Sequence, residues 1–174
     1  MIALRLRDTA FKRVLKTMRE GTDVEISGPY GSFALPEEAS NPIVFLAGGI
    51  GITPFRSMSI FAGRKKLPHR IFLFYSNRRP KDAPFLEELE ALQKENHNFT
   101  LIATMTEGEK SQEIWSGETG YIQRAMFEKY IKTDLQHPLY YIAGPPAMVF
   151  AMRGILAEIG VSESRVLTEQ FSGY

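Results

Sequence analysis

Residues 44–55 read Val44-Phe45-Leu46-Ala47-Gly48-Gly49-Ile50-Gly51-Ile52-Thr53-Pro54-Phe55. The apolar run predicts a buried strand of a parallel sheet, and the glycines after it predict an immediate turn into a helix. Thr53 suits the N-cap of that helix and Pro54 its first position. Glycines let a backbone approach a ligand closely, and the free N–H groups of a helix start attract negative charge. The stretch therefore indicates a pyrophosphate cradle; the alternative is a tight strand-to-helix connection without a ligand.

Composition limits what the chain can be. Its 174 residues, 44% of them hydrophobic, suffice for one well-buried domain, or for one domain plus a fragment of another. The net charge of +1 lacks the basic excess of a nucleic-acid-binding protein. Apolar runs are far shorter than the ~20 residues of a membrane span. Because the N-terminus has no signal-peptide core, we expect a cytoplasmic protein.

Several kinds of chemistry are excluded by residue type. The chain has no cysteine, which rules out disulfides, a cysteine nucleophile, thiolate-bound zinc and cysteine-bound iron–sulfur clusters. His69, His97 and His137 are scattered near expected loops without metal-ligand spacing, so we predict no metal site. The sequence also lacks a Gly-x-Ser-x-Gly elbow and a Ser-x-x-Lys pair, so no hydrolase nucleophile is visible.

From residue 42 onward, strand-like and helical segments alternate, which predicts an α/β fold with a parallel sheet between helices. Five strands are expected, over residues 43–47, 70–76, 99–105, 138–143 and 165–170. Helices are expected near residues 54–63, 83–95, 121–130 and 146–159.

The first part of the chain reads differently. Residues 2–7 and 23–27 alternate as antiparallel strands do, with an amphipathic helix expected over residues 10–18. A Gly-Pro-Tyr-Gly turn follows at residues 28–31. This segment is too small to bury a core of its own, so we expect a partial antiparallel β segment, from a second domain or an arm packed on the main one.

The end of the second expected strand carries polar and basic residues. Sites selective for NAD commonly place a carboxylate about 20 positions after the glycines. Here that region offers Ser76, Asn77, Arg78 and Arg79 before Asp82. Hydroxyl, amide and guanidinium groups suit a ribose 2′-phosphate, which favours NADPH over NADH. The alternative is a solvated basic turn.

Two further strand ends, and the end of the chain, add to the predicted site. Thr104 and Thr106 place hydroxyls where the third strand should end. At residues 143–148, Ala-Gly-Pro-Pro-Ala-Met forms a second strand that ends in glycine before a proline-started helix. Two such turns in one sheet would form opposite walls of one crevice, which disfavours a ligand-free connection. Phe171 and Tyr174 would either seal the core or cover a flavin ring.

Together these residues resemble the ferredoxin–NADP⁺ reductase superfamily of flavin-dependent NAD(P)H oxidoreductases. Residues 47–54 are similar to the family's nicotinamide-domain turn, and residues 143–148 to its Cys-Gly-Pro-x-x-Met turn, with Ala143 in place of the cysteine. Residues 75–79 are similar to its ribose-phosphate site, and residues 169–174 to its aromatic carboxyl terminus. The resemblance covers nearly the whole chain and implies a Rossmann-like NAD(P)-binding domain.

The N-terminal segment fits the same resemblance. Residues 7–12 resemble the flavin-pyrophosphate turn of the family's FAD-binding barrel, and residues 28–31 its closing Gly-Pro-x-Gly segment. This implies a barrel remnant at residues 1–38 and the NAD(P)-binding domain at residues 39–174. The family's flavin-holding Arg-x-Tyr-Ser/Thr strand is missing from the 174 residues, so we do not expect them to bind FAD independently.

The resemblance also implies roles for individual residues. Phe171 would lie against the flavin ring with Glu169 nearby, as the catalytic positions. Gly49, Gly51 and Thr53 would hold the pyrophosphate and nicotinamide side. The residues expected to bind a cofactor, NADPH or NADH and FAD, are Gly48, Gly49, Gly51, Ile52, Thr53, Pro54, Ser76, Asn77, Arg78, Thr106, Gly144, Pro145, Pro146, Met148, Thr9, Ala10, Phe11, Lys12 and Tyr174.

The favoured function is the NAD(P)H-binding module of an FAD-dependent oxidoreductase, with hydride transfer between NAD(P)H and FAD. Electrons would pass to a redox acceptor protein or iron–sulfur domain on another chain, and a second copy would complete the truncated barrel. The alternative is a nucleotide-binding or interaction module that keeps the fold without the reaction. An ordinary Rossmann dehydrogenase is a third possibility, but the sequence shows no acid/base residue for it, such as a Tyr-x-x-x-Lys pair.

Overall fold

The computed structural model describes residues 4, 8–28, 33–110 and 114–170. Contacts divide the chain into two units, Met1–Ser32 and Phe33–Tyr174. The first unit contains the helix α1, Ala10–Thr17, whose N-cap is Thr9. The Thr9 hydroxyl accepts a hydrogen bond from the backbone N–H of Lys12 at 3.3 Å. The helix predicted over residues 10–18 is therefore confirmed.

The antiparallel segment expected at the N-terminus is wrong for the part of it that the structure describes. Residues 23–27 form no strand. The other expected strand, residues 2–7, lies outside the described residues except for Leu4, as do residues 29–31 of the expected turn. Two short strands without a third strand or an apolar partner are marginal in water, which explains why alternation alone misled. The domain boundary after residue 38 stays a prediction.

The second unit is built on a sheet of six parallel strands in the order β4-β3-β2-β1-β5-β6. All five predicted strands are present, but the predicted number is wrong. The additional strand, β4, has two residues at the sheet edge, too few to leave a periodic pattern in the sequence. The strands are β1 Ile43–Gly48, β2 Ile71–Asn77, β3 Phe99–Met105, β4 Glu118–Thr119, β5 Leu139–Gly144 and β6 Val166–Gln170.

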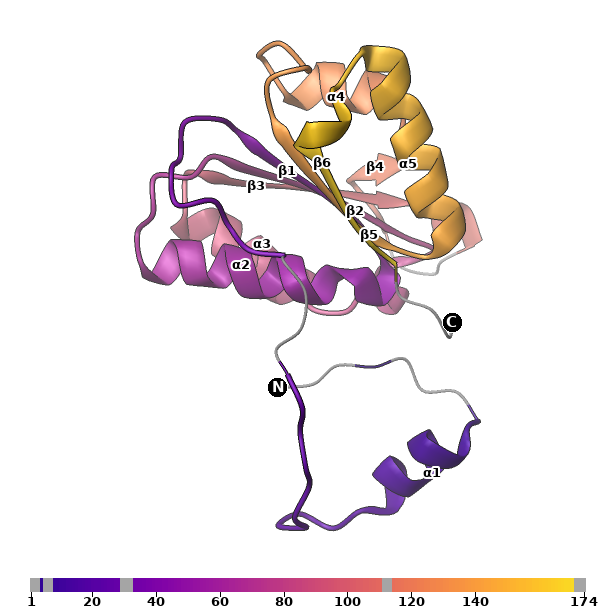
Figure 1. Ribbon diagram of the computed structural model, residues 1–174. Coiled ribbons are helices and arrows are strands. Elements are labelled where there is room, and N and C mark those ends of the chain that lie inside the picture. Colours follow the sequence, from indigo (N-terminus) through magenta and orange to yellow (C-terminus); the bar gives the residue numbers. More distant parts are fainter. Residues whose placement is uncertain (1–3, 5–7, 29–32, 111–113, 171–174) are drawn as a thin grey trace. The chain divides into compact units, whose positions relative to one another are not determined.

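Helices cover both faces of this sheet. Figure 1 shows α2 and α3 on one face and α4 and α5 on the other. Helix α3 begins later than predicted because Phe85 adopts a left-handed backbone, with φ 62°, just before it. The helices are α2 Ile52–Arg64, α3 Leu86–Glu95, α4 Arg124–Tyr130 and α5 Pro146–Ile159.

The sheet separates two apolar cores, and β1 is buried along its whole length. On the α2/α3 face, the rings of Phe45 and Phe55 stack with their centroids 4.5 Å apart. On the α4/α5 face, Phe74 meets Phe127 edge-on at 5.0 Å. A continuous apolar strand such as β1 is typical of a parallel sheet covered on both sides. This packing fixes the carboxyl ends of the strands relative to one another.

Residues 33–36 run against the α2/α3 side of the same unit. The Phe33 ring stacks on Phe55 at 5.8 Å and meets Tyr141 edge-on at 5.4 Å. The Tyr141 hydroxyl donates a hydrogen bond to the Ala34 carbonyl at 2.9 Å. His69, although it lies in a loop, is buried, and its Nε2 lies 2.9 Å from the Pro36 carbonyl oxygen. These contacts anchor the segment that leads into β1.

Candidate functional site

The direction in which the chain adds strands to the sheet reverses beside β1. The chain proceeds from β1 to β2, β3 and β4 on one side, and then returns to place β5 and β6 on the other side of β1. In open α/β sheets, ligands bind outside the carboxyl ends of the strands at the point where the direction reverses. Here that point lies between β1 and β5, and each of these strands ends in one of the two glycine turns.

The first turn leaves open space at its second glycine. Gly49 has φ +53°, a left-handed conformation that favours glycine, and a Cβ built there would meet no atom within 4 Å. A short 3₁₀ helix, Gly49–Gly51, leads directly into α2. The free N–H groups at the start of α2 therefore follow a backbone position that a ligand could approach closely.

The predicted helix start in this turn is wrong by two residues. Gly51 is the cap of α2 and already has a helical backbone, with φ −60° and ψ −7°. Thr53 is therefore the second helical residue and makes no side-chain capping bond, and Pro54 is the third. The 3₁₀ turn starts the helix early, which the glycine pattern could not indicate. Proline at the third position still removes no intrahelical hydrogen bond, because the first four N–H groups have no partner there.

The two glycine turns are in direct contact. A Cβ built at Gly51 would lie 2.2 Å from the carbonyl oxygen of Ala143, so only glycine allows this approach. A Cβ built at Gly144 would lie 3.2 Å from the backbone nitrogen of Gly48, and one built at Gly48 would lie within 2.4 Å of Met148 Sδ. The structure therefore brings these predicted residues together at the β1/β5 switch point.

The second turn begins α5 as predicted. Pro145 is the N-cap of α5 and Pro146 its first residue, where proline is favoured. The Pro145 carbonyl accepts hydrogen bonds from the N–H groups of Met148 at 2.9 Å and Val149 at 3.1 Å. The starts of α2 and α5 thus both lie at the carboxyl ends of the strands, on opposite faces of the sheet (Figure 1).

Tyr75 links the first glycine turn to the loop after β2. Its hydroxyl lies 3.3 Å from the Gly49 carbonyl oxygen and 3.1 Å from the Pro84 carbonyl oxygen. The ring is fully buried, and this burial raises the pKa of Tyr75 well above its ordinary value, so the phenol stays a hydrogen-bond donor. In the sequence, Tyr75 belongs to the segment that is similar to the family's ribose-phosphate site, but no pattern indicates which carbonyls a buried phenol meets.

The polar residues predicted at the end of β2 lie next to the end of β3. Ser76 is in register with Gly48, and Asn77 with Met105. The Asn77 carbonyl accepts hydrogen bonds from the backbone N–H of Thr106 at 2.9 Å and from its hydroxyl at 3.3 Å. Thr106 therefore uses its hydroxyl within the protein. The Asn77 side chain is buried, and its Nδ2 makes no hydrogen bond within the described part of the chain.

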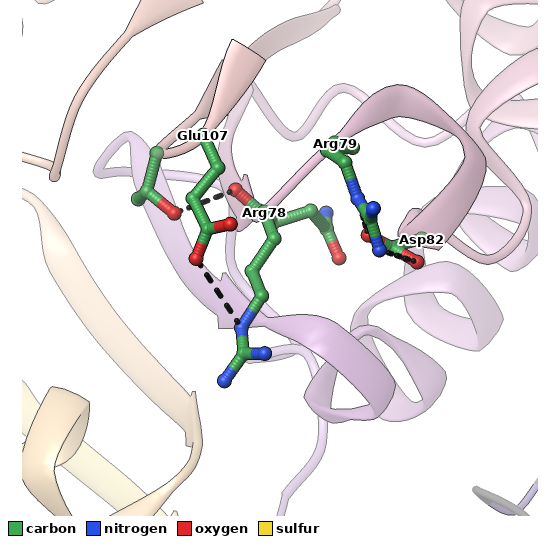
Figure 2. Close-up of polar contacts among 6 residues, drawn as sticks. Arg78, Arg79, Asp82 and Glu107 are labelled. Atoms are coloured by element: carbon green, nitrogen blue, oxygen red, sulfur yellow. Dashed lines mark hydrogen bonds and ion pairs between the residues drawn. The ribbon is translucent and has the colours of Figure 1, made fainter. Parts of the chain in front are cut away.

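The two arginines after β2 point in different directions (Figure 2). Arg79 forms a forked pair with Asp82, Nε to Oδ2 at 2.7 Å and Nη2 to Oδ1 at 3.4 Å. This hydrogen-bonded pairing raises the pKa of Arg79, with a smaller contribution from the charge of Glu107. Arg78 extends beside Glu107 instead, with Nε 4.0 Å from Oε1. Glu107 is a residue that sequence reasoning missed, although it directly follows Thr106.

The residues predicted to meet a flavin are only partly within the described chain. Glu169 lies in β6, in register with Ala143, so it is at the carboxyl ends of the strands, as is the second glycine turn. Phe171 and Tyr174 lie outside the described residues. In the first unit, Thr9 caps α1, while Phe11 is largely exposed. The flavin contacts assigned to these residues stay predictions.

A metal centre and a membrane-spanning helix are both absent from the described residues. Among them, no group of three or more His, Asp or Glu side chains is arranged to hold a metal ion. No helix in the same residues combines the length and apolar character that crossing a bilayer requires.

Comparison with known proteins identifies the second unit. Residues 45–154 match the family described as the oxidoreductase NAD-binding domain. The F subunit of the Na(+)-translocating NADH-quinone reductase of Histophilus somni is 33% identical over 161 residues, which cover 90% of this chain and 39% of that protein. Its counterpart in Methylococcus capsulatus is 34% identical over 163 residues, with the same coverage. The chain thus spans about two fifths of the length of these relatives.

Solved structures share the fold. A flavohemoglobin from Malassezia yamatoensis with bound FAD and heme gives a TM-score of 0.82 at 21% identity, over 97% of this chain and 43% of that one. The cytochrome b5 reductase domain of Ulva prolifera nitrate reductase gives 0.78 at 24% identity, over 92% and 66%. At these identities the similarity supports the fold alone.

Proposed function

Because the chain belongs to the oxidoreductase NAD-binding domain family, we propose that it binds a reduced nicotinamide dinucleotide across the carboxyl ends of its strands. One observation carries this proposal: two glycine turns meet at the β1/β5 switch point, where Gly51 packs on the carbonyl of Ala143. Beside them, Gly49 leaves open space before the start of α2, where the free N–H groups of the helix would attract a pyrophosphate. The residues present therefore fit such a ligand.

Each part of the proposed site has its own role. Gly49, Gly51 and Thr53 face the pyrophosphate and the nicotinamide side. Arg78, at the end of β2, lies at the adenosine end, beside Ser76 and Asn77. The turn at residues 144–147 forms the opposite wall. Tyr75 is a positioning residue, because its hydroxyl holds the Gly49 carbonyl and so orients the peptide that faces the ligand.

The reaction that we propose is hydride transfer from the dinucleotide to a flavin. A nicotinamide held at this site would supply a hydride, that is, two electrons together with one proton. The contribution of the chain is to orient the dinucleotide and to keep water from the reacting face, with Glu169 and Phe171 proposed to lie nearest the flavin. The relatives are subunits of an NADH-quinone reductase, which supports oxidoreductase activity.

The flavin and the electron acceptor are proposals about a larger assembly. Thr9, Ala10, Phe11 and Lys12 are proposed to lie toward the flavin pyrophosphate. The acceptor is proposed to be a redox protein or an iron–sulfur domain on another chain, and a second copy of this chain is proposed to complete the barrel. A cytoplasmic location stays a prediction, which cell fractionation would test.

Titration of the purified chain with NADH, NADPH and FAD tests the proposed function. We expect at least one dinucleotide to bind with micromolar affinity by calorimetry. We expect FAD, when retained, to show absorption peaks that bleach after NADH or NADPH is added. If neither dinucleotide binds, the proposal is wrong.

A binding module without a flavin reaction is the second candidate function. It is favoured by the first unit, in which the described residues, 4 and 8–28, contain no barrel strand. The same titration separates the two functions. Dinucleotide binding without bleaching of a flavin, whether added FAD or the flavin of a separate flavoprotein, would favour the binding module.

A further inference from the structure

The chain continues the pairing of β2 and β3 beyond both strands. After Asn77 and Met105, the backbone N–H of Thr106 donates to the Asn77 carbonyl at 2.9 Å, and that of Glu107 donates to the Arg78 carbonyl at 2.8 Å. The side chains of Arg78 and Glu107 therefore start from hydrogen-bonded neighbouring positions, and their charged groups approach to 4.0 Å. Figure 2 shows the two side chains running alongside each other. The continued pairing therefore fixes the backbone positions from which these two side chains extend.

The neighbouring arginine, Arg79, does not take the position beside Glu107. Arg79 turns toward Asp82, which holds it through two hydrogen bonds. Arg78 is the basic side chain that extends at the end of β2, and 69% of it is exposed. Any ligand group that reaches Arg78 therefore also meets the carboxylate of Glu107, of which 36% is exposed.

We propose that Glu107 is the residue that selects NADH over NADPH, by accepting a hydrogen bond from the adenosine 2′-hydroxyl and repelling a 2′-phosphate. This inference rests on the proposed function, because it places the adenosine ribose at the end of β2. The acidic residue that dinucleotide sites use for the ribose diol commonly follows β2 itself. Here the carboxylate follows the adjacent strand, β3, and the continued pairing of the two chains brings it to the same point. This selection is the opposite of the preference for NADPH that the residues after β2 indicate in the sequence alone.

The charges explain the direction of the preference. A phosphate monoester carries roughly −1.5 to −2 charges at neutral pH and would pair well with a free guanidinium. Beside Arg78, however, the carboxylate of Glu107 cancels much of that attraction and adds repulsion of its own. A ribose hydroxyl has no charge and can donate to the same carboxylate, so NADH gains where NADPH loses.

Calorimetric titration of the full chain with NADH and with NADPH tests this inference. We compare the unsubstituted protein, Glu107→Gln and the control Glu163→Gln. Glu163 is an exposed carboxylate that pairs with Arg153, in the turn before β6, at the opposite edge of the sheet. We expect the unsubstituted chain to bind NADH more tightly. In Glu107→Gln, NADPH should bind about five- to tenfold more tightly, because a repulsion between close charges is removed.

The remaining outcomes of this titration distinguish a failure of the inference from a failure of the proposed function. NADH affinity should stay the same or fall severalfold in Glu107→Gln, and Glu163→Gln should change neither dinucleotide. The inference is overturned if the ratio of the two affinities is the same in Glu107→Gln and the unsubstituted chain, or if the unsubstituted chain prefers NADPH. If the unsubstituted chain binds neither dinucleotide, the proposed function itself fails. A thermal unfolding curve for each variant confirms that it is folded.

Discussion

The hydroxyl of Tyr75 lies 3.3 Å from the carbonyl oxygen of Gly49, and through this contact a buried strand side chain fixes the backbone of the glycine turn. The same hydroxyl lies 3.1 Å from the Pro84 carbonyl oxygen, in the loop after β2. One phenolic hydrogen is shared between two acceptors, one in the glycine turn and one in the loop that leads from β2 to α3. Tyr75 therefore ties the proposed pyrophosphate turn to that loop.

Tyr75→Phe should weaken dinucleotide binding about five- to tenfold, because the Gly49 peptide loses the donor that orients it. The matched control is Tyr140→Phe, which removes the hydrogen bond from another buried phenol to the Leu135 carbonyl, near the other edge of the sheet. Each substitution should lower the free energy of unfolding by about 1 kcal/mol. Calorimetry and urea unfolding measure the two effects. Equal binding losses in both variants would show that Tyr75 has no special role.

Substitutions of three glycines should have three different results. Gly49→Ala places a methyl group in open space but requires a left-handed backbone, so we expect a loss of about 1 kcal/mol in the free energy of unfolding. Because that methyl group would occupy the space proposed for the pyrophosphate, dinucleotide affinity should fall about tenfold or more. Gly51→Ala forces a Cβ against the Ala143 carbonyl and should cost about 3 kcal/mol.

Gly154→Ala is the control for these variants. Gly154 lies in α5, and a Cβ built there meets nothing within 4 Å. Alanine should therefore raise the free energy of unfolding by up to about 1 kcal/mol through helix propensity alone, with dinucleotide binding unchanged. Normal binding by Gly49→Ala would argue against a pyrophosphate at this turn.

The parallel sheet could be predicted because its strands are buried on both faces. Residues 99–105 and 146–159 carry their apolar pattern over their whole length, and the strand and helix there begin and end as predicted. The strand β4 could not be predicted, since two residues have no period; it is held by its neighbours, with the Thr104 hydroxyl donating to the Gly120 carbonyl at 2.7 Å.

The parts of the site that depend on the local backbone could be predicted from the sequence. The parts that depend on contacts between different strands could not. Glycine and proline restrict the chain locally, so the turns at Gly49 and Gly144 are visible in the sequence. The start of α2 was misplaced because a 3₁₀ turn and an N-cap threonine compete for the same residues. Glu107 meets Arg78 only through the pairing of β2 with β3, which no local pattern encodes.

A carboxylate that anchors β4 to α4 should make stability depend on pH. Glu118 accepts hydrogen bonds from Lys129 Nζ and the Tyr130 hydroxyl, both at 2.5 Å. The hydrogen bond from Lys129, followed by that from Tyr130, lowers the pKa of Glu118 below its ordinary value of 4.5. A carboxylate with a lowered pKa in the folded state stabilises the fold above its unfolded pKa. This stabilisation is lost as the pH falls through the folded pKa.

Glu118→Gln should therefore lower the free energy of unfolding by about 1 kcal/mol at neutral pH, and by progressively less as the pH falls below about 4. Urea unfolding at several pH values measures the difference. The control, Glu128→Gln, breaks an exposed pair with Arg124 and should cost only about 0.3 kcal/mol. A loss in Glu118→Gln that stays constant down to the lowest pH would contradict the role of the ionised carboxylate.

Arg78→Ala should weaken NADPH binding more than NADH binding, because Arg78 is the exposed guanidinium at the end of β2 and a 2′-phosphate is the group that it would pair with. We expect NADPH affinity to fall about fivefold and NADH affinity by less than half of that factor. The matched control is Arg79→Ala, one residue further on, whose guanidinium is already held by Asp82. It should leave the ratio of the two affinities unchanged.

The same experiment locates the adenosine end of the site. Arg78 and Arg79 are adjacent and carry the same charge, so a general electrostatic effect on an anionic ligand would appear in both variants. A change in the affinity ratio that is confined to Arg78→Ala would place the ribose between Arg78 and Glu107, because the guanidinium of Arg78 lies 4.0 Å from this carboxylate, whereas that of Arg79 is hydrogen-bonded to Asp82. Equal losses of NADH and NADPH in Arg78→Ala would instead place the 2′ position of the ribose away from both residues.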